Sequence, residues 1–260
     1  MRSFADSPIQ RDGRVLVLAH DHGLEHGPAA FESTRQRLDP EAVFEMATHD
    51  AVTAFAVGKG LAETYYPSYE DDVTLLAKLN GTSSLWMGEP DSSVSWSVDY
   101  AADLGADAVG FTVYPGANHE VEMTEEFREV QEAARDLDLP VGMWSYPRGQ
   151  ALKDHRAPEV IAYATRIGLE LGADMAKVKH PGSREALAWA CEAAGDMPVL
   201  LSGGSKVSDE AFLRTVEEAF EAGVSGLAVG RNIWQREEPE PFLDALEAVV
   251  FEGESADAVV

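Results

Sequence analysis

The chain has almost no cysteine, since Cys191 is the only one among 260 residues. A single cysteine excludes an internal disulfide framework, and its flank ALAWACEAAG predicts a small buried apolar residue on a helix rather than a nucleophile. No stretch approaches the roughly 18 to 20 apolar residues of a membrane-spanning helix. The first residues, MRSFADSPIQRDG, lack the apolar core of a signal peptide. We therefore expect a cytoplasmic protein without membrane contact.

Positive charge is also scarce. There are 20 basic residues, only six of them lysine, against 46 acidic ones, which gives a net charge of −26. The carboxylates are spread over helical segments such as EMTEEFREVQEAARD (122–136), so they predict solvated helix faces rather than an acidic tail. An acidic surface keeps a protein soluble at high salt, so we expect a halophilic cytosol. The same charge argues against a nucleic-acid partner, which needs basic faces.

Short apolar runs alternate with amphipathic stretches along the whole chain. The expected strands are 14–20, 51–57, 83–87, 107–113, 140–146, 173–179, 198–204 and 225–230. The expected helices lie near 40–49, 70–79, 94–104, 120–137, 157–171, 184–194, 208–222 and 240–250. Eight alternating units predict parallel, buried strands. A doubly wound sheet also alternates in this way, but the absence of a GxGxxG turn favours one (β/α)8 TIM barrel over residues 1–260, with 251–260 as a frayed tail.

Chemistry in such a barrel lies at the C-terminal ends of the strands. Polar residues gather there: Asp21 after the first expected strand, Trp144, Tyr146 and Arg148 at the fifth, and Lys177 and Lys179 at the sixth. Side chains alternate along a strand. This places Met175, Lys177 and Lys179 toward the barrel axis, and Ala176 and Val178 toward the helices. Depth favours Lys177, since Lys179 lies at the mouth.

A lysine enclosed in a barrel can become a neutral amine, because burial and nearby cations lower its pKa. Such an amine attacks a ketone, and the resulting iminium withdraws electrons during carbon–carbon cleavage. We therefore predict Lys177 as a Schiff-base nucleophile; the alternative is a lysine paired with an internal carboxylate such as Asp21. Tyr146 is predicted as a general acid or base, or else as a core tyrosine. Asp21 would orient or deprotonate substrate hydroxyls, and Trp144 would form a pocket wall.

A phosphate site is expected after the seventh and eighth strands, where barrels often bind phosphate with backbone amides. Its residues are Ser202, Gly203, Gly204, Gly230 and Arg231, with added charge from Lys206. The alternative is two ordinary tight turns. Arg148 and Lys179 are further candidate substrate-binding residues.

Three histidines, His20, His22 and His26, raise the possibility of a metal site. Their spacing crosses a strand end into a glycine-bearing loop, and His180 is the one other histidine at a strand end. We expect them to pack the loop and to form hydrogen bonds, with neither a metal nor a cofactor. The segments TYYPSY (64–69) and GEPDSS (88–93) are expected in loops over the same face, where they shape the pocket or a subunit contact.

The sequence resembles the archaeal-type class I fructose-bisphosphate aldolases, which are related to the DhnA group. The matching segments, in order over nearly the whole chain, are AHDHGLEHGPAAF, GKGLAETYY, KLNGTSSLWMGEP, GFTVYPG, WSYPRG, APEVIAYATRIGLELGADMAKVKHPG, PVLLSGGSK and GLAVGRNIWQR.

The resemblance implies a (β/α)8 barrel, a metal-free Schiff-base mechanism and ring-shaped homo-oligomers, often decamers. It implies Lys177 as the Schiff-base lysine, Tyr146 as the general acid/base, Asp21 as an active-site aspartate and Trp144 as the neighbouring aromatic residue. The phosphate-site positions correspond to Ser202, Gly203, Gly204, Gly230 and Arg231. The chain departs from the family pattern in HPGS after Lys179 and in Ser205, where proline is common, which bears on the second phosphate and the exact substrate.

The resemblance predicts cleavage of a phosphorylated sugar, fructose 1,6-bisphosphate, in glycolysis and gluconeogenesis. A sister group makes 2-amino-3,7-dideoxy-D-threo-hept-6-ulosonate with the same lysine, but its members tend to have MDHGxxxGP and KTNYTG. Two further alternatives are a metal-dependent aldolase and a non-catalytic phosphosugar-binding barrel. The presence of Lys177, Tyr146 and Asp21 argues against the non-catalytic barrel.

Overall fold

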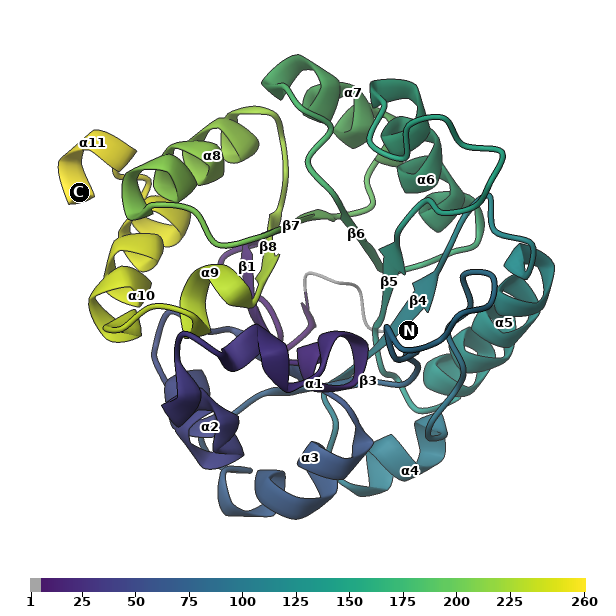
Figure 1. Ribbon diagram of the computed structural model, residues 1–260, viewed down its shortest axis with the longest axis horizontal. Helices are drawn as coiled ribbons and strands as arrows, with labels where there is room; N and C mark the ends of the chain where they lie inside the picture. The colour runs from purple at the N-terminus through teal and green to yellow at the C-terminus, as the bar shows by residue number, and fades with distance from the viewer. Residues whose placement is uncertain (1–5) are drawn as a thin grey trace.

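The computed structural model describes residues 6–260. Eight parallel strands close into a barrel in which every strand pairs with its neighbours in sequence and β8 pairs with β1. Figure 1 looks along the barrel and shows the helices as a ring outside the strands. The expected single (β/α)8 TIM barrel is confirmed.

The strands are short. They are β1 (Val15–Ala19), β2 (Ala54–Val57), β3 (Leu75–Lys78), β4 (Ala108–Val113), β5 (Val141–Ser145), β6 (Met175–Val178), β7 (Val199–Ser202) and β8 (Gly226–Val229). The helices are α1 (His22–His26), α2 (Pro40–Ala47), α3 (Lys59–Tyr65), α4 (Val98–Asp103), α5 (Glu120–Asp136), α6 (Pro158–Glu170), α7 (Arg184–Ala194), α8 (Asp209–Glu221), α9 (Arg231–Trp234), α10 (Pro239–Glu247) and α11 (Ala256–Val259). Single turns occur at Pro28–Phe31, Arg35–Leu38 and Tyr66–Ser68, and a π-helical turn, η5, spans Ala248–Glu252.

Strand alternation divides the core into two parts. The barrel interior holds small and medium side chains from every strand around one large ring: Ile9, Val15, Val17, Ala54, Ala56, Leu76, Ala108, Trp144, Met175, Leu200 and Ala228. Ala176 and Val178 belong instead to the larger cluster between strands and helices. The orientation predicted for the sixth strand is therefore correct, and Lys177 shares the inward side with Met175.

Glycine makes room for the Trp144 ring. Gly110 on β4 has no side chain, and an added Cβ would lie 2.7 Å from both Cη2 and Cζ3 of Trp144. It would also lie 2.8 Å from Cδ2 of Leu76, so the barrel interior has no room for a methyl group at this level. The position of Trp144, which is 1% exposed, thus depends on a glycine one strand away.

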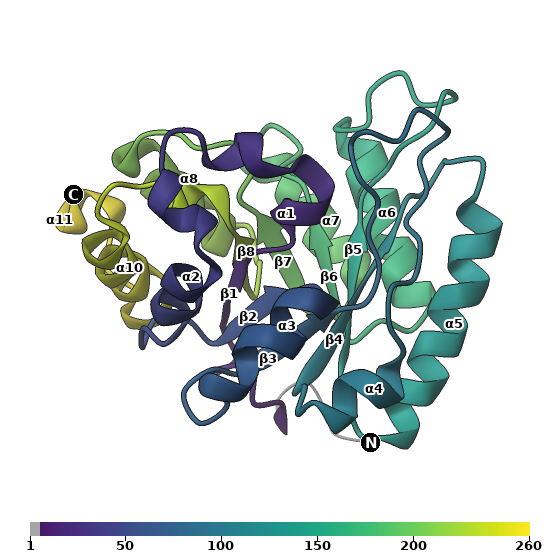
Figure 2. The same cartoon turned by 60° about the horizontal axis from the view of Figure 1, so that its bottom comes forward.

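The third unit differs from the prediction. We expected a helix at 70–79 and a strand at 83–87, but β3 is Leu75–Lys78 and the helix before it is α3. All four β3 residues are buried, whereas Leu85 and Met87 are 87% and 95% exposed. A short apolar run does not distinguish a buried strand from an exposed loop, and SSLWM belongs to the loop after β3. Figure 2 shows this dark blue loop rising from one end of the barrel.

The C-terminal residues form α11 and pack against α8, which differs from the expected frayed tail. Helix α11 contacts α8, and Ala256 is fully buried. The backbone N–H of Ala256 donates to Oε2 of Glu217, and Arg214 pairs with Asp257 at 2.7 Å. Buried Ala256 and the ion pair therefore attach this segment to the helix layer, although its composition alone suggested a solvated end. Among residues 6–260, no helix is long and apolar enough to cross a membrane.

We predict that Gly110→Ala lowers the free energy of unfolding by about 1–3 kcal/mol, because the new methyl group overpacks the ring of Trp144. Denaturant unfolding in molar salt measures the change. Gly60→Ala on α3 is the matched control, since nothing lies within 4 Å of its added Cβ. It should leave the stability unchanged or raise it by up to about 1 kcal/mol. Equal midpoints for the two variants would contradict the packing assigned to Trp144.

Candidate active site

A cavity of about 490 Å³ opens at the C-terminal ends of the strands. It has a volume typical of small-molecule sites. Eleven of the twelve predicted site residues line it: Asp21, Trp144, Tyr146, Arg148, Lys177, Lys179, Ser202, Gly203, Gly204, Gly230 and Arg231. Residues from β1, β5, β6, β7 and β8 therefore meet in one place, as the strand-end argument predicted.

Lys177 extends from β6 into the base of the cavity and is 5% exposed. Its Nζ lies 4.8 Å from the ring centroid of Trp144, which is its register partner on β5. Burial lowers the pKa of Lys177; the carboxylates of Asp21 and Glu25 act in the opposite direction, while Lys78 and Arg231 add to the lowering. The balance favours a neutral amine more than in water, which a lysine nucleophile requires.

Lys78 is a buried lysine that the sequence analysis did not single out. It ends β3 and is 2% exposed, with Nζ 5.9 Å from the same Trp144 centroid. Nζ donates to Oδ1 of Asn80 at 2.9 Å and also to the Asn80 carbonyl. It was missed because the third strand was placed eight residues too late. A strand at 75–78 would have put Lys78 at a strand end, where polar residues carry functional meaning.

Asp21 follows β1 and lies at the base of the cavity among positive groups. Its Oδ1 is 3.4 Å from Nδ1 of His22. Burial alone would raise the pKa of Asp21, but His22 and the ammonium groups of Lys177 and Lys78 outweigh burial and lower the pKa. Asp21 is therefore ionised at neutral pH. Glu25 on α1 has the opposite character, since burial and the Asp21 charge raise its pKa.

Tyr146 directly follows β5 and lies near both Lys177 of β6 and Lys179 just after that strand. The Nζ atoms of Lys177 and Lys179 are 6.0 and 5.3 Å from its ring centroid. Burial and the negative charges of Asp21 and Glu25 raise its pKa well above the ordinary value, with Ser202 acting in the opposite direction. The phenol is therefore protonated and suited to donate a proton before it accepts one.

The loops after β7 and β8 are joined by Asn232, a fully buried residue that the sequence analysis did not predict. Its Nδ2 donates to the carbonyls of Gly203 and Ser205, at 2.6 and 3.1 Å, and its Oδ1 accepts from the Val207 N–H at 3.0 Å. These bonds fix the shape of the glycine loop predicted to bind phosphate. The Nε of Arg231 is buried without a hydrogen-bond partner within residues 6–260, as expected of a donor that awaits an anion.

A second group of cations lines the other side of the barrel. Lys179 lies near Arg148 and Arg156, and all three face the cavity. Burial, followed by the charges of Arg148 and Arg156, lowers the pKa of Lys179 to about 8. Arg156 was not predicted, because it lies in the loop before α6 rather than at a strand end.

Lys206 is the one predicted site residue that the structure places elsewhere. It is exposed, lies outside the cavity lining, and its Nζ donates to the Gln235 carbonyl at 2.8 Å. Its neighbours Ser205 and Val207 do line the cavity, but the Lys206 ammonium group contacts the end of α9 instead.

His20, His22 and His26 are not among the side chains that lie close enough together to hold a metal ion within residues 6–260. His20 is enclosed by the rings of Phe31, Phe55 and Trp234, with centroids 5.5, 6.2 and 6.0 Å away. Burial and the neighbouring His22 lower the pKa of His20 to about 4, so it is neutral. This agrees with the predicted packing role of His20.

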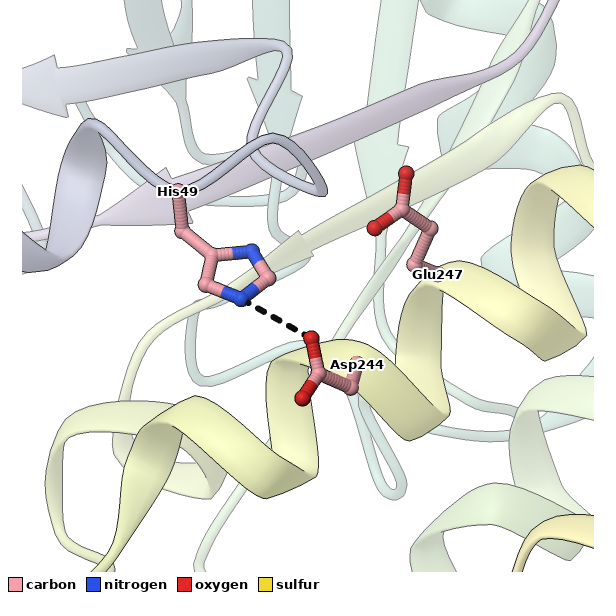
Figure 3. Close-up of side chains that lie close together, drawn as sticks. All are labelled: His49, Asp244 and Glu247. Carbon is pink, nitrogen blue, oxygen red and sulfur yellow. Dashed lines mark ion pairs between the residues drawn. The ribbon is translucent and has the colours of Figure 1, made fainter.

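One group of metal-ligating side chains lies close together in residues 6–260, and it is remote from the cavity. It consists of His49, Asp244 and Glu247, with His49 Nε2 3.2 Å from Asp244 Oδ1 (Figure 3). His49 precedes β2, so the group lies toward the N-terminal ends of the strands. Nδ1 of His49 accepts the Ala51 N–H at 3.1 Å, which leaves the ring proton on Nε2, and Glu247 is paired with Arg11. The group is thus satisfied without an ion.

Cys191 lies half-buried on α7, away from the cavity lining. Burial, followed by the charge of Glu192, raises the pKa of its thiol to about 11. A protonated thiol is a poor nucleophile, as the sequence analysis expected.

Comparisons with known proteins identify the family of this barrel. A model of the DeoC/LacD family aldolases matches residues 15–236. The chain belongs to the DeoC/LacD family of aldolases.

Three relatives define its place in that family. It is 68% identical over 257 residues to a class 1 fructose-bisphosphate aldolase of Halobacterium salinarum, covering 99% of this chain and 98% of the other. It is 29% identical over 252 residues to a 2-amino-3,7-dideoxy-D-threo-hept-6-ulosonate synthase of the same organism, covering 97% and 92%. It superposes with a TM-score of 0.90 and 44% identity on an archaeal fructose-1,6-bisphosphate aldolase whose catalytic lysine is covalently bound to the carbinolamine intermediate of the substrate, covering 94% and 96%.

We predict that sulfate binds the cavity more weakly as the pH rises from 7 to 9, because Lys179 loses its charge near pH 8 while sulfate keeps its own. The loss of one charge-assisted contact should weaken binding about tenfold. Titration calorimetry at constant potassium chloride measures the change. Lys179→Met should bind weakly and independently of pH, and Lys153→Met, at an exposed lysine, should behave as the unaltered protein. An unchanged pH slope in Lys179→Met would assign the effect to another group.

Proposed function

We propose that this protein is a class I fructose-1,6-bisphosphate aldolase, which reversibly cleaves its substrate to dihydroxyacetone phosphate and glyceraldehyde 3-phosphate. The observation that carries the proposal is the buried Lys177, whose pKa is lowered at the base of a cavity with cations on two sides. The 68% identity to a class 1 fructose-bisphosphate aldolase supports the same activity.

The reaction begins at Lys177. Its neutral amine attacks the C2 ketone, and the carbinolamine loses water to give a protonated iminium. The C4 hydroxyl then loses its proton, the C3–C4 bond breaks, and its electron pair moves into the iminium, which becomes a neutral enamine. Glyceraldehyde 3-phosphate leaves, C3 is protonated, and water hydrolyses the iminium, which releases dihydroxyacetone phosphate and restores the amine.

Tyr146 is the proposed proton carrier. Because its phenol is protonated at neutral pH, it donates a proton to the hydroxyl group that leaves the carbinolamine. The resulting phenolate is a strong base, since its pKa lies well above 10, and it then accepts the C4 hydroxyl proton. Asp21 remains ionised throughout and orients the substrate hydroxyls, while Trp144 forms the wall beside the reacting carbons.

The two phosphates occupy the two cationic sides of the cavity. Ser202, Gly203, Gly204, Gly230 and Arg231 bind one of them, through the backbone of the glycine loop and a guanidinium with an unused Nε. Arg148 and Lys179, with Arg156, bind the other. Local cations are needed because the chain as a whole carries −26 and repels an anionic substrate at a distance.

Three other functions are less well supported. The chain is far less similar to the hept-6-ulosonate synthase than to the aldolase of the same organism. A metal-dependent aldolase would need ligands at the cavity, and the one close group within residues 6–260 lies at the opposite end of the barrel; activity that chelators do not change would remove this alternative. A non-catalytic phosphosugar-binding barrel has no need for the Lys177, Tyr146 and Asp21 arrangement.

We also propose a homo-oligomeric, ring-shaped assembly such as a decamer, in a halophilic cytoplasm. The loop after β3 exposes Leu85, Trp86 and Met87, and α6 and α7 expose Tyr163 and Trp189. Large apolar side chains on so acidic a surface suit subunit contacts at high salt, where charge repulsion between copies is screened. Sedimentation equilibrium in molar potassium chloride is expected to give a mass several times 28.1 kDa.

We predict that borohydride reduction in the presence of fructose 1,6-bisphosphate and molar salt leaves a sugar-phosphate adduct on Lys177, identified by mass spectrometry of its peptide. Reduction makes the iminium permanent, so the adduct reports mechanism and substrate class together. Lys177→Met should give no adduct, and Lys179→Met should still be labelled at Lys177. An adduct on Lys179 would reassign the nucleophile, and its absence from folded protein would overturn the proposed function.

A second variant, Tyr146→Phe, tests the proposed proton carrier. It removes only the phenolic oxygen, so the cavity keeps its shape while dehydration of the carbinolamine loses its acid. We expect cleavage to slow by about 10²- to 10⁴-fold, with less adduct at a fixed reduction time.

A further inference from the structure

The ammonium group of Lys78 is held by hydrogen bonds inside the protein rather than surrounded by water. Its Nζ donates to both oxygens of Asn80, and Asn80 is itself held by neighbouring backbone groups. The Thr112 N–H donates to its Oδ1 at 2.7 Å, and its Nδ2 donates to the carbonyls of Ser92 and Thr112 at 3.1 and 2.8 Å. The ammonium group is thus fixed by neutral partners, and its charge remains available to act on the carboxylates of the cavity.

The cavity base poses a problem of charge balance. Asp21 is ionised and buried, and a buried carboxylate requires a positive neighbour. If Lys177 were that neighbour alone, Asp21 would hold it in the protonated form, which cannot attack a ketone. The charges of both Asp21 and Glu25 do act on Lys177 in this direction. A second cation that balances Asp21 removes the conflict.

The position of Lys78 meets this need. Lys78 from β3 and Lys177 from β6 both lie near the ring of Trp144, with Nζ 5.9 and 4.8 Å from its centroid. The other titratable groups that face this space are His22 and Glu25 from α1, Tyr146 after β5 and Arg231 from α9. Burial lowers the pKa of Lys78, the charges of Glu25 and Asp21 oppose that lowering, and Lys78 in turn opposes the protonation of Lys177.

We propose that Lys78 is a positioning residue for the Schiff-base reaction: held by Asn80, it serves as the counter-ion of Asp21 and so leaves Lys177 free to react as a neutral amine. This inference rests on the proposed function. It assigns the two buried lysines different states at neutral pH, with Lys78 charged and Lys177 able to lose its proton. Lys78 itself forms no bond to the substrate carbon.

The test is the pH dependence of Lys177 labelling by cyanoborohydride and dihydroxyacetone phosphate, from pH 6 to 9.5 in molar salt. Removing the Lys78 charge raises the pKa of Lys177, so the limb on which labelling rises with pH should move upward in Lys78→Met. At pH 7 labelling should be about tenfold slower, since one unit is a tenfold change in the deprotonated fraction. Near pH 9.5 it should approach the rate of the unaltered protein.

Two variants separate charge from structure. Lys78→Arg keeps the charge and should restore the original pH profile, and Lys59→Met, at a partly exposed lysine of α3, should leave it unchanged. Lys78→Gln removes the charge but keeps a donor for Asn80, and it replaces Lys78→Met if that variant does not fold. Circular dichroism checks the fold of each.

The outcomes are distinct. If the unaltered protein gives no adduct on Lys177, the proposed function fails. If the adduct forms but the neutral variants of Lys78 are slower by one constant factor at every pH, or unchanged, the counter-ion role is wrong. An upward shift of the limb in the neutral variants, reversed by Lys78→Arg, establishes it.

Discussion

The ring of Trp144 fills the barrel axis at the level where the apolar interior meets the cavity, and the surrounding residues are fitted to it. Gly110 on the neighbouring strand leaves space for its edge, while Lys78 and Lys177 place their ammonium groups within 6 Å of its centre. A large aromatic ring excludes water from below and still interacts favourably with cations. The two lysine side chains are therefore shielded from water but keep a favourable neighbour. This burial contributes to every shifted pKa at the cavity base.

The charges above that ring are balanced as a group rather than in pairs. Asp21 is ionised, whereas the pKa of Glu25 is raised by burial and by Asp21, and burial lowers the pKa of both Lys78 and Lys177 while the two carboxyl groups oppose that lowering. Low dielectric makes each of these interactions stronger than in water. Removing any one member therefore changes the protonation of the others, so a single substitution here alters pH dependence as well as rate.

Most of the predicted fold and site followed from the alternation of side chains along the strands. Seven strands and the inward side of Lys177 followed from short apolar runs and the period of two, and eleven of twelve site residues line one cavity because strand ends converge in a closed barrel. The third strand was misplaced because LLAK and SSLWM are both short and apolar, and only packing shows which is buried. That error concealed Lys78. Asn232 and Arg156 could not be found from strand ends, because one acts through a loop contact and the other lies in a loop.

The distribution of lysine and arginine follows from what each can do. Three of the six lysines, Lys78, Lys177 and Lys179, have lowered pKa values at or beside the cavity base. The exterior instead uses arginine in ion pairs such as Arg128–Glu132 and Arg166–Glu170. Arginine stays charged wherever it is placed, whereas lysine shifts its pKa readily on burial. An acidic exterior at high salt needs permanent cations, and Schiff-base chemistry needs one that can be neutral. In this chain the scarcity of lysine and its concentration at the cavity are thus two consequences of the same difference between the two side chains.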